Sequence, residues 1–499
     1  MKVAEPPSRN RVRTLVEALL YQADEWPNSP FLHDVESGVR LTYSEAERRA
    51  AAFASLLASH RVGAGDRVAI ALENRSEWVV AFLGCLWAGA VPVPINTRWG
   101  RDEVSAALAD CEPALVLSEA RHRASIGQEF HDRVIDADDL PRKAPALLPS
   151  PRSSSEALGL ITYTSGTTGT PKGVMLSQGS LFLSSAYYAG LFNSGRDLAT
   201  AITVPLFHNT GFIDGLGHAI VAGGSVDLYR RFSPTAIGRH LAAGSYSFFI
   251  GVPTMYTRLA GVLGRSAGGN ADPWLAYGGG LMPNDTPARL RQAFPEARFV
   301  NCYGLSEATS ITHYMPWRLA EGRWDATGIP VPGTWDRIAD AGELLIQSPT
   351  AMIGYWRHEE ETATRFVNGW LRTGDLAARG PDGILRVLGR IDDVINRGGE
   401  KVAPFEIESA LCELAEILEA SVVGLPNPDL GQVPAALVVL RPGHGFDPRS
   451  IRDRLSERIA DYKVPVLIRS IEALPRNANG KVLSSAVRTR LVREADGPA

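Results

Sequence analysis

The chain has 499 residues, of which 45% are hydrophobic and 21% are charged, and its formal net charge is −4. This length exceeds what one hydrophobic core supports, so we expect about two to five domains or subdomains. A slightly negative charge offers no bulk attraction to nucleic acid or to an anionic membrane, and we expect neither as a partner.

The first residues, "MKVAEPPSRNRVRTLVEALL", are basic but contain no sustained apolar segment followed by a cleavage site. Four cysteines, at positions 85, 111, 302 and 412, are far apart and lack metal-ligand spacing. Neither a disulfide framework nor a zinc site is predicted. We therefore expect a cytoplasmic protein.

An apolar stretch from Trp78 to Ile95, "WVVAFLGCLWAGAVPVPI", reaches the minimum length of a membrane span. Gly89, Pro92 and Pro94 would end a helix inside it and begin an extended segment. We predict a buried helix that leads into a buried strand.

Short β-branched runs alternate with amphipathic helical stretches through the first 300 residues or so. Runs such as "RVAIAL", "LITYT" and "SVDLY" predict strands, and "SEAERRAAAFASLLASH" predicts a helix. This alternation indicates a layered α/β fold with much parallel strand pairing.

The stretch from Tyr163 to Gln178, "YTSGTTGTPKGVMLSQ", combines glycines, hydroxyl side chains and one lysine between two predicted strands. Such a loop can present backbone N–H groups, hydroxyls and a positive charge to a polyphosphate. A flexible linker is the alternative, but the flanking strands favour a binding loop on a rigid scaffold. The candidate residues are Thr164, Ser165, Gly166, Thr167, Thr168 and Lys172.

The loop does not match the common nucleotide-binding motifs. Pro171 stands where a Walker A loop needs its second glycine, and Gly173 stands where the motif needs a hydroxyl. The glycines at 278 to 280 are consecutive, which does not match the Rossmann fingerprint.

From about 320 to 390 the pattern changes to strands and turns, which predicts a small β-rich subdomain. A new helix is predicted over 404–418, with Ile407, Leu411, Leu414 and Leu418 on one face, followed by two strands. We expect an N-terminal domain over 1–390 and a smaller α+β domain over 391–499.

Seven motifs appear in one order along the chain: "YTSGTTGTPKGV", "VPLFHNTG", "YGGGLMP", "NCYGLSE", "WLRTGD", "GRIDDVINRGGEKVAPFEIE" and "LPRNANGKV". Together they resemble the adenylate-forming superfamily, and most closely its acyl-CoA ligase branch. The resemblance spans about residues 15 to 490. It implies that the small domain is mobile and rotates between two reactions, with a hinge at about 390–393.

The resemblance implies that a carboxylic acid attacks the α-phosphorus of ATP, with Mg²⁺, to form an acyl-adenylate and pyrophosphate, and that the acyl group then passes to CoA. Preorganised donors and charges would stabilise the negative charge that builds up. Glu307 resembles the Mg²⁺ ligand, Ser306 the α-phosphate contact and Tyr303 the ring stacked on adenine. The remaining nucleotide contacts implied are the loop above with Lys172, the glycines Gly278, Gly279 and Gly280, and the ribose ligands Asp375 and Arg390.

The C-terminal motifs imply three further roles. Lys481 resembles the lysine that bridges the carboxylate and the α-phosphate during adenylation. Asp392 resembles the hinge residue, and Gly399 would line the passage of the pantetheine arm. Taken singly, each residue also has an ordinary structural explanation, such as a solvated lysine or a turn cap.

The acid pocket is the least specified part of the site. His208 resembles the histidine that gates this pocket, and Phe207, Gly211 and Phe212 are lining candidates. Asp214 lies among small and apolar residues and is expected to be buried, so it needs a partner. Either it accepts a hydrogen bond from a substrate N–H or O–H, or it caps a structural element. No arginine is adjacent in these stretches, which disfavours a second substrate carboxylate.

The sequence leaves other functions open. An ATP-dependent amide synthetase would pass the same adenylate to a free amine without CoA. A self-contained peptide-synthetase module is disfavoured, since no carrier segment follows residue 499. A serine hydrolase is suggested by "GLSEA" around Ser306, which lacks the final glycine of its motif. A non-catalytic nucleotide-binding protein is the last alternative. We expect a ligase for a small or aromatic carboxylic acid.

Overall fold

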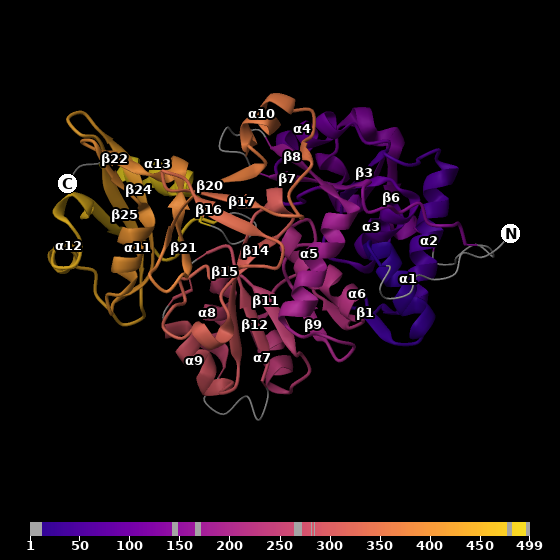
Figure 1. Ribbon diagram of the computed structural model, residues 1–499, viewed down its shortest axis with the longest axis horizontal. Coiled ribbons are helices and arrows are strands. Elements are labelled where there is room, and N and C mark those ends of the chain that lie inside the picture. Colours follow the sequence, from indigo (N-terminus) through magenta and orange to yellow (C-terminus); the bar gives the residue numbers. More distant parts are fainter. Residues whose placement is uncertain are drawn as a thin grey trace.

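The computed structural model describes residues 12–141, 148–164, 171–263, 272–280, 282–283, 285–476 and 482–495. Figure 1 shows an elongated molecule, with the N-terminal segments (indigo to orange) on one side and the C-terminal segments (orange to yellow) on the other. The layered α/β fold predicted from the sequence is confirmed by the sheets and helices of the N-terminal part.

A nine-stranded sheet forms the centre of the N-terminal part. Its six middle strands run parallel, and antiparallel strands close both edges. In spatial order the strands are β15 (Ile329–Pro330), β14 (Ile311–Tyr314), β13 (Arg298–Gly304), β12 (Trp274–Tyr277), β11 (Phe248–Gly251), β9 (Ala199–Ile202), β10 (Ser225–Leu228), β1 (Pro30–Asp34) and β2 (Arg40–Thr42).

Two smaller sheets lie beside it. A parallel sheet contains β4 (Val91–Pro94), β3 (Arg67–Ala71), β5 (Leu115–Ser118) and β6 (Val134–Asp136). An antiparallel sheet contains β18 (Gly354–Tyr355), β8 (Lys172–Ser177) and β7 (Leu158–Thr164). Thr164 and Lys172, the first and last candidates of the predicted polyphosphate loop, pair at the end of the β7–β8 hairpin.

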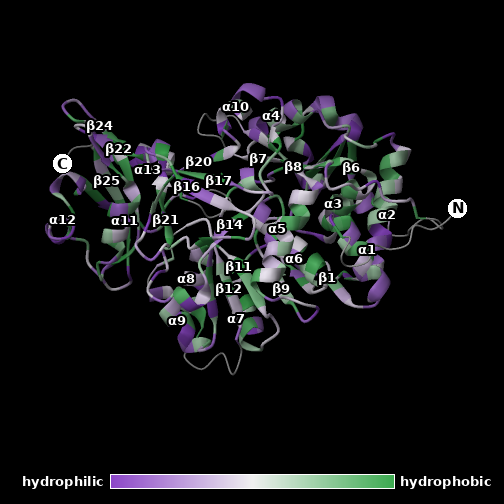
Figure 2. Cartoon of the chain, in the orientation of Figure 1, coloured by the Kyte–Doolittle hydropathy of each residue, from purple (hydrophilic) through white to green (hydrophobic). Residues whose placement is uncertain are grey.

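Helices accompany these sheets in the alternating order that the sequence predicts. They are α1 (Leu15–Glu25), α2 (Tyr43–Ser59), α3 (Ser76–Ala88), α4 (Arg101–Cys111), α5 (Gln178–Leu191), α6 (His218–Ala222), α7 (Pro234–Ala242), α8 (Pro253–Val262) and α9 (Asp285–Ala293). Helix α2 begins at a capping box, in which the Thr42 hydroxyl accepts from the Glu45 backbone N–H and the Glu45 carboxylate accepts from the Thr42 N–H. Figure 2 shows hydrophobic residues concentrated between the layers and hydrophilic residues on outer helices such as α12 (Pro448–Ser456).

The β-rich part predicted over about 320–390 is a five-stranded antiparallel sheet. It consists of β16 (Trp335–Ile338), β17 (Glu343–Gln347), β20 (Trp370–Arg379), β19 (Phe366–Val367) and β21 (Leu385–Arg390). The short helix α10 (Glu359–Arg365) precedes β19, packs against β18 and lies near β8 in Figure 1.

The C-terminal part has its own sheet: β23 (Glu400–Val402), β22 (Ile395–Arg397), β25 (Gly431–Leu440), β24 (Ile417–Asn427) and β26 (Leu467–Ser470). Helices α11 (Pro404–Cys412), α12 and α13 (Ser484–Ala495) accompany it. Two hydrophobic clusters here contain only residues from 395 onward. An ion pair between Arg441 and Asp285, 2.6 Å apart, connects this part to α9.

The prediction of a helix over 404–418 is wrong for the residues after Cys412. Helix α11 ends at Cys412, and Leu418 lies in β24, where Ile417 pairs with Leu440. Strand pairing with β25 competes for these apolar residues and outweighs their helical spacing. Leu414 is nevertheless buried in the same cluster as Ile407 and Leu411.

The apolar stretch from Trp78 to Ile95 forms a buried helix and strand, as predicted. Helix α3 ends at Ala88, Gly89 adopts a left-handed conformation with φ of 74°, and β4 follows. Among the described residues, no helix is long and apolar enough to cross a membrane.

Candidate functional site

The metal-ligand candidate Glu307 lies on a single turn of 3-10 helix, η6 (Ser306–Ala308), which directly follows β13. Its Oε1 accepts a hydrogen bond of 2.8 Å from the Tyr355 hydroxyl and lies 3.4 Å from Nη2 of Arg365. The Met352 backbone N–H donates to the Glu307 carbonyl at 2.7 Å. The carboxylate is therefore held in place from β18 and α10 while its side chain stays 14% exposed.

A strained turn follows Glu307 and fixes the chain beyond it. Thr309 has φ of 68° and ψ of −48°, and the Ser310 N–H donates to the Ala308 carbonyl at 2.8 Å, which defines a γ-turn of the rare, strained kind. The Thr309 hydroxyl donates to the Thr350 carbonyl at 2.7 Å. A Cβ on Gly304 would collide with the Ser310 carbonyl, so only glycine fits there. Such strain persists where surrounding contacts over-determine the backbone.

The ribose candidates Asp375 and Arg390 face each other on adjacent strands. Asp375 on β20 pairs in register with Arg390 on β21, and Nη1 of Arg390 lies 3.2 Å from Asp375 Oδ1. The Tyr303 hydroxyl donates to Asp375 Oδ2 at 2.5 Å. The structure thus brings together three residues that are up to 87 positions apart, Tyr303, Asp375 and Arg390, around one buried carboxylate. A carboxylate has about four lone-pair sites, so Asp375 retains acceptor capacity for a ligand hydroxyl.

The three consecutive glycines follow β12, next to the end of β13. A Cβ on Gly278 would collide with the Cys302 carbonyl, so this glycine is required by the protein's own backbone. Gly279 has φ of 75°, and at Gly280 the nearest heavy atoms to an added Cβ lie 3.9 Å away. Gly279 and Gly280 therefore leave their backbone open to the close approach of a flat ligand.

The polyphosphate loop is only partly within the described residues. Thr164 and Lys172 pair at the open end of the β7–β8 hairpin. The loop candidates Ser165, Gly166, Thr167 and Thr168 lie outside the described residues. The Lys172 ammonium forms an ion pair of 2.6 Å with Oε2 of Glu361 on α10.

The pocket candidates Phe207 and His208 precede a π-helix, η5 (Thr210–Gly217). Their rings contact each other edge to face, with centroids 4.5 Å apart. Burial and, to a smaller extent, the nearby Arg98 charge together lower the pKa of His208 to about 3, so the imidazole is neutral at pH 7. Arg98 is a cation near the pocket that inspection of the neighbouring sequence overlooked.

Gly211 and Phe212 have structural explanations in this arrangement. A Cβ on Gly211 would lie 3.0 Å from Leu206 Cα and closer still to the Pro205 carbonyl. The Phe212 ring is fully buried and packs with Trp78 and Phe82. Core packing accounts for Phe212, and its role in the pocket stays a prediction.

Asp214 is buried, as the sequence predicts, with 3% exposure. The Ser310 hydroxyl donates to its Oδ1 at 2.6 Å, and hydrogen bonds from Tyr188 and Thr210 also favour its ionised form. Burial is the larger effect and raises the pKa of Asp214 to about 7. Asp214 therefore connects the π-helix to the strained turn after Glu307, which favours the structural interpretation over a direct substrate contact.

Asp214→Asn is expected to gain stability relative to the native protein as pH rises. Between pH 4 and 7 the folded protein retains a proton on Asp214 that the unfolded chain has lost, so raising the pH destabilises the native fold. The free energy of unfolding of Asp214→Asn, measured relative to that of the native protein, should rise by roughly 2 kcal/mol from pH 5 to pH 8. Urea denaturation at both pH values measures this shift, with the exposed Asp197→Asn as control. Equal shifts in both variants would contradict it.

The hinge candidate Asp392 lies on η8 (Ile391–Asp393), directly after Arg390. It borders a cavity of about 190 Å³ lined by Glu343, Thr364, Arg365, Arg372, Gly374, Arg390, Ile391 and Asp392. Gly399 lies apart from this group, in the turn between β22 and β23, with no heavy atom within 4 Å of an added Cβ. Lys481 lies outside the described residues.

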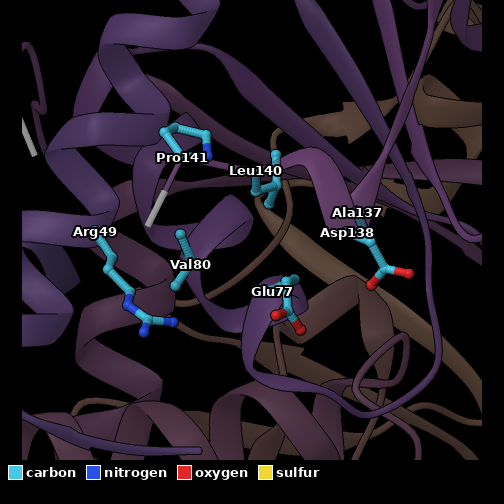
Figure 3. A pocket seen from close by; sticks show the side chains of 7 residues that line it. All are labelled: Arg49, Glu77, Val80, Ala137, Asp138, Leu140 and Pro141. Atoms are coloured by element: carbon cyan, nitrogen blue, oxygen red, sulfur yellow. The ribbon is translucent and has the colours of Figure 1, made fainter. Parts of the chain in front are cut away.

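Another cavity, shown in Figure 3, lies beside α2 and α3 and has a volume of about 10 Å³. This is close to the smallest volume that holds one water molecule. Its lining residues include Arg49, Glu77 and Asp138, none of which belongs to the site described above. It is too small for an organic acid.

The donor set around Glu307 fits a nucleotide-bound Mg²⁺ ion. Within the described residues, no three His, Cys, Asp or Glu side chains cluster as a metal site would require. Mg²⁺ in nucleotide enzymes commonly takes one or two carboxylates and receives its other ligands from phosphate and water. One oriented, partly exposed carboxylate beside the β7–β8 hairpin matches that pattern.

Sequence reasoning missed the residues that hold the candidate groups. Tyr355, Glu361 and Arg365 contact Glu307 or Lys172 from a short, charged segment. Helix α10 is only 7 residues long, and its acidic start is typical of a solvated face. Contacts of this kind depend on which strand lies beside β8, and the local sequence carries no signal for that.

Comparison with known proteins identifies two family models in this chain. The model described as "AMP-binding enzyme" matches residues 19–356, and the model described as "AMP-binding enzyme C-terminal domain" matches residues 406–481. Among curated proteins, feruloyl-CoA synthase from an Amycolatopsis species is 31% identical over 472 residues, covering 91% of this chain and 94% of its own. Indoleacetate–CoA ligase from Aromatoleum aromaticum is 30% identical over 482 residues, covering 91% and 94%.

A solved structure extends the comparison to bound ligands. The o-succinylbenzoate CoA synthetase of Bacillus subtilis matches with a TM-score of 0.83 and 28% identity. The match covers 94% of this chain and 97% or 98% of the solved chain. That protein has been solved with its acyl-adenylate intermediate and with ATP and a magnesium ion.

Proposed function

This chain belongs to the AMP-binding enzyme family as an ATP- and Mg²⁺-dependent acid–CoA ligase, and we propose that its acid is an aromatic carboxylic acid without a second anionic group. It converts the acid and ATP into an acyl-adenylate and pyrophosphate, and then transfers the acyl group to CoA. The assignment of individual residues and the choice of acid are proposals.

The adenylation site proposed here is the group around Asp375 and Glu307. The observation that carries it is the convergence of Tyr303 and Arg390 on the Asp375 carboxylate, beside an oriented Glu307. In this proposal the Asp375 carboxylate accepts hydrogen bonds from the ribose hydroxyls, and the Tyr303 ring stacks on adenine. Glu307 would hold Mg²⁺, which when bound supplies positive charge to the phosphates.

The remaining contacts complete the proposed reaction. Lys172 and the loop before it bind the β- and γ-phosphates, and Ser306 contacts the α-phosphate. Lys481 would bridge the acid carboxylate and the α-phosphate as charge develops there. The small domain, 391–499, would then turn about Asp392 and bring Gly399 to the pantetheine passage. Separate hydrophobic clusters on either side of residue 395 support such a division.

The acid preference is inferred from the charges near the pocket. His208 is neutral at pH 7, and Arg98 is the cation near it, so the inference rests on Asp214, the buried carboxyl group that follows on the π-helix. A second substrate carboxylate directed toward Asp214 would meet a group of like charge or a neutral acid. Feruloyl-CoA synthase and indoleacetate–CoA ligase are named for aromatic acids with one carboxylate, whereas the o-succinylbenzoate CoA synthetase is named for an acid with two, so the proposed preference rests on the charges and not on the relatives. We also place the enzyme in the cytoplasm, where ATP and CoA are available.

Acid-dependent AMP formation tests the proposal directly. A panel of benzoate, ferulate and indoleacetate is compared with malonate, sulfoacetate and o-succinylbenzoate, each with and without CoA, and the products are identified by mass. We expect AMP and thioester from the first group, with strong stimulation by CoA. A preference for the second group would overturn the proposed acid class. Adenylate formation that responds to an amine and not to CoA would favour the amide synthetase.

A further inference from the structure

Helix α10 carries two charged side chains, four residues apart, that reach both candidate ATP-site groups. Glu361 pairs with Lys172 at 2.6 Å, and Arg365 lies 3.4 Å from Glu307 Oε1. Residues at i and i+4 share one face of a helix, so one short element faces both the phosphate lysine and the metal carboxylate. Figure 1 shows α10 above the β7–β8 hairpin, and Figure 2 shows it as predominantly hydrophilic.

The position of α10 is set by the hairpin that carries Lys172. Strand β18 pairs with β8 through Gly354 with Met175 and Tyr355 with Val174. The Tyr355 N–H donates to the Thr362 hydroxyl at 2.8 Å, which in turn donates to the His358 carbonyl at 2.8 Å.

The other end of the helix is anchored as well. Nη2 of Arg365 donates to the Thr373 carbonyl at 3.1 Å, two residues before Asp375. Anchored in this way at both ends, α10 holds the Glu361 carboxylate against the lysine.

A carboxylate and a phosphate oxygen compete for the same ammonium group. Lys172 is 22% exposed and Glu361 is 43% exposed, so both side chains reach solvent, while the Glu361 Oε2 atom that faces the lysine is buried. A polyphosphate that binds Lys172 brings its own negative charge against the Glu361 carboxylate and shares the ammonium group with it, so Glu361 weakens polyphosphate binding.

We propose that Glu361 is a positioning residue that competes with the polyphosphate for Lys172 and thereby promotes release of pyrophosphate. This role rests on the proposed function, in which Lys172 binds the β- and γ-phosphates. Glu361 weakens the binding of ATP and of pyrophosphate, but not of AMP, which lacks those phosphates. Release of pyrophosphate is thus favoured after the acyl-adenylate has formed.

The test measures equilibrium binding by calorimetry with α,β-methylene-ATP, magnesium pyrophosphate and AMP. Glu361→Gln should bind the ATP analogue and pyrophosphate about three- to fivefold more tightly, the effect of losing one partly exposed ion pair, and AMP equally well. Pyrophosphate should also inhibit this variant at correspondingly lower concentrations. In a Lys172→Gln background the same substitution should have no effect.

The neighbouring Glu360→Gln is the matched control. Glu360 is exposed on the same helix, and its loss changes the net charge by the same amount. Equal tightening in both variants, a parallel change in AMP affinity or no change in Glu361→Gln would each overturn the role of Glu361. A native protein that binds neither AMP nor the ATP analogue would overturn the proposed function, and the role of Glu361 with it.

Discussion

Glu307→Gln is expected to lower the rate of acid-dependent AMP formation about 10²- to 10³-fold, the usual cost of removing one preorganised electrostatic group. The amide keeps the size of the side chain but removes the negative charge that would hold Mg²⁺ and that faces Arg365. The Mg²⁺ concentration that gives half of the maximal rate should rise at the same time. Steady-state AMP formation over a range of Mg²⁺ concentrations measures both effects.

Tyr355→Phe separates orientation from charge in this experiment. It removes the hydroxyl that donates to Glu307 Oε1 at 2.8 Å but keeps the carboxylate. We expect a loss of about tenfold or less, equivalent to one hydrogen bond. A Glu307→Gln enzyme within about threefold of the native rate would exclude Glu307 as the metal ligand.

The identities of the nucleotide-site candidates were accessible from the sequence because each stands in a motif whose order along the chain is informative. Tyr303, Asp375 and Arg390 are expected together from those motifs, and the structure brings them into direct contact. The burial of Asp214 follows from its small and apolar neighbours. The layered fold follows from the alternation of apolar strands with helices.

The partners of these groups were not accessible, because they depend on tertiary placement. Nothing in "EEETATR" indicates that Glu361 reaches Lys172, since this contact requires β18 to pair with β8. The strained turn at Thr309 has no glycine to signal its positive φ. The end of α11 at Cys412 depends on pairing of β24 with β25, which helical periodicity does not report.

Asp375→Asn is expected to weaken the binding of AMP and ATP by about 10- to 100-fold, the cost of losing charge-assisted hydrogen bonds. The native carboxylate accepts a hydrogen bond from the Tyr303 hydroxyl and faces the Arg390 guanidinium. A carboxylate can accept from both groups and still accept a further hydrogen bond from a ribose hydroxyl. An asparagine amide has one acceptor oxygen and directs its NH₂ group at one of these donors. Isothermal calorimetry with AMP measures the loss.

Deoxynucleotides distinguish a ribose contact from a merely structural one. If Asp375 binds the ribose hydroxyls, the 2′- or 3′-deoxy form of AMP should bind the native protein more weakly, and Asp375→Asn should then add little further loss. Tyr303→Phe is the control, since it removes one donor to Asp375 and leaves the carboxylate intact. If Asp375→Asn weakens the binding of AMP and of both deoxy forms by the same factor, the role of Asp375 is to hold Tyr303 and Arg390 in place. Because that carboxylate is only 7% exposed, its loss would then leave Arg390 without its charge partner, and the effect would appear as reduced stability.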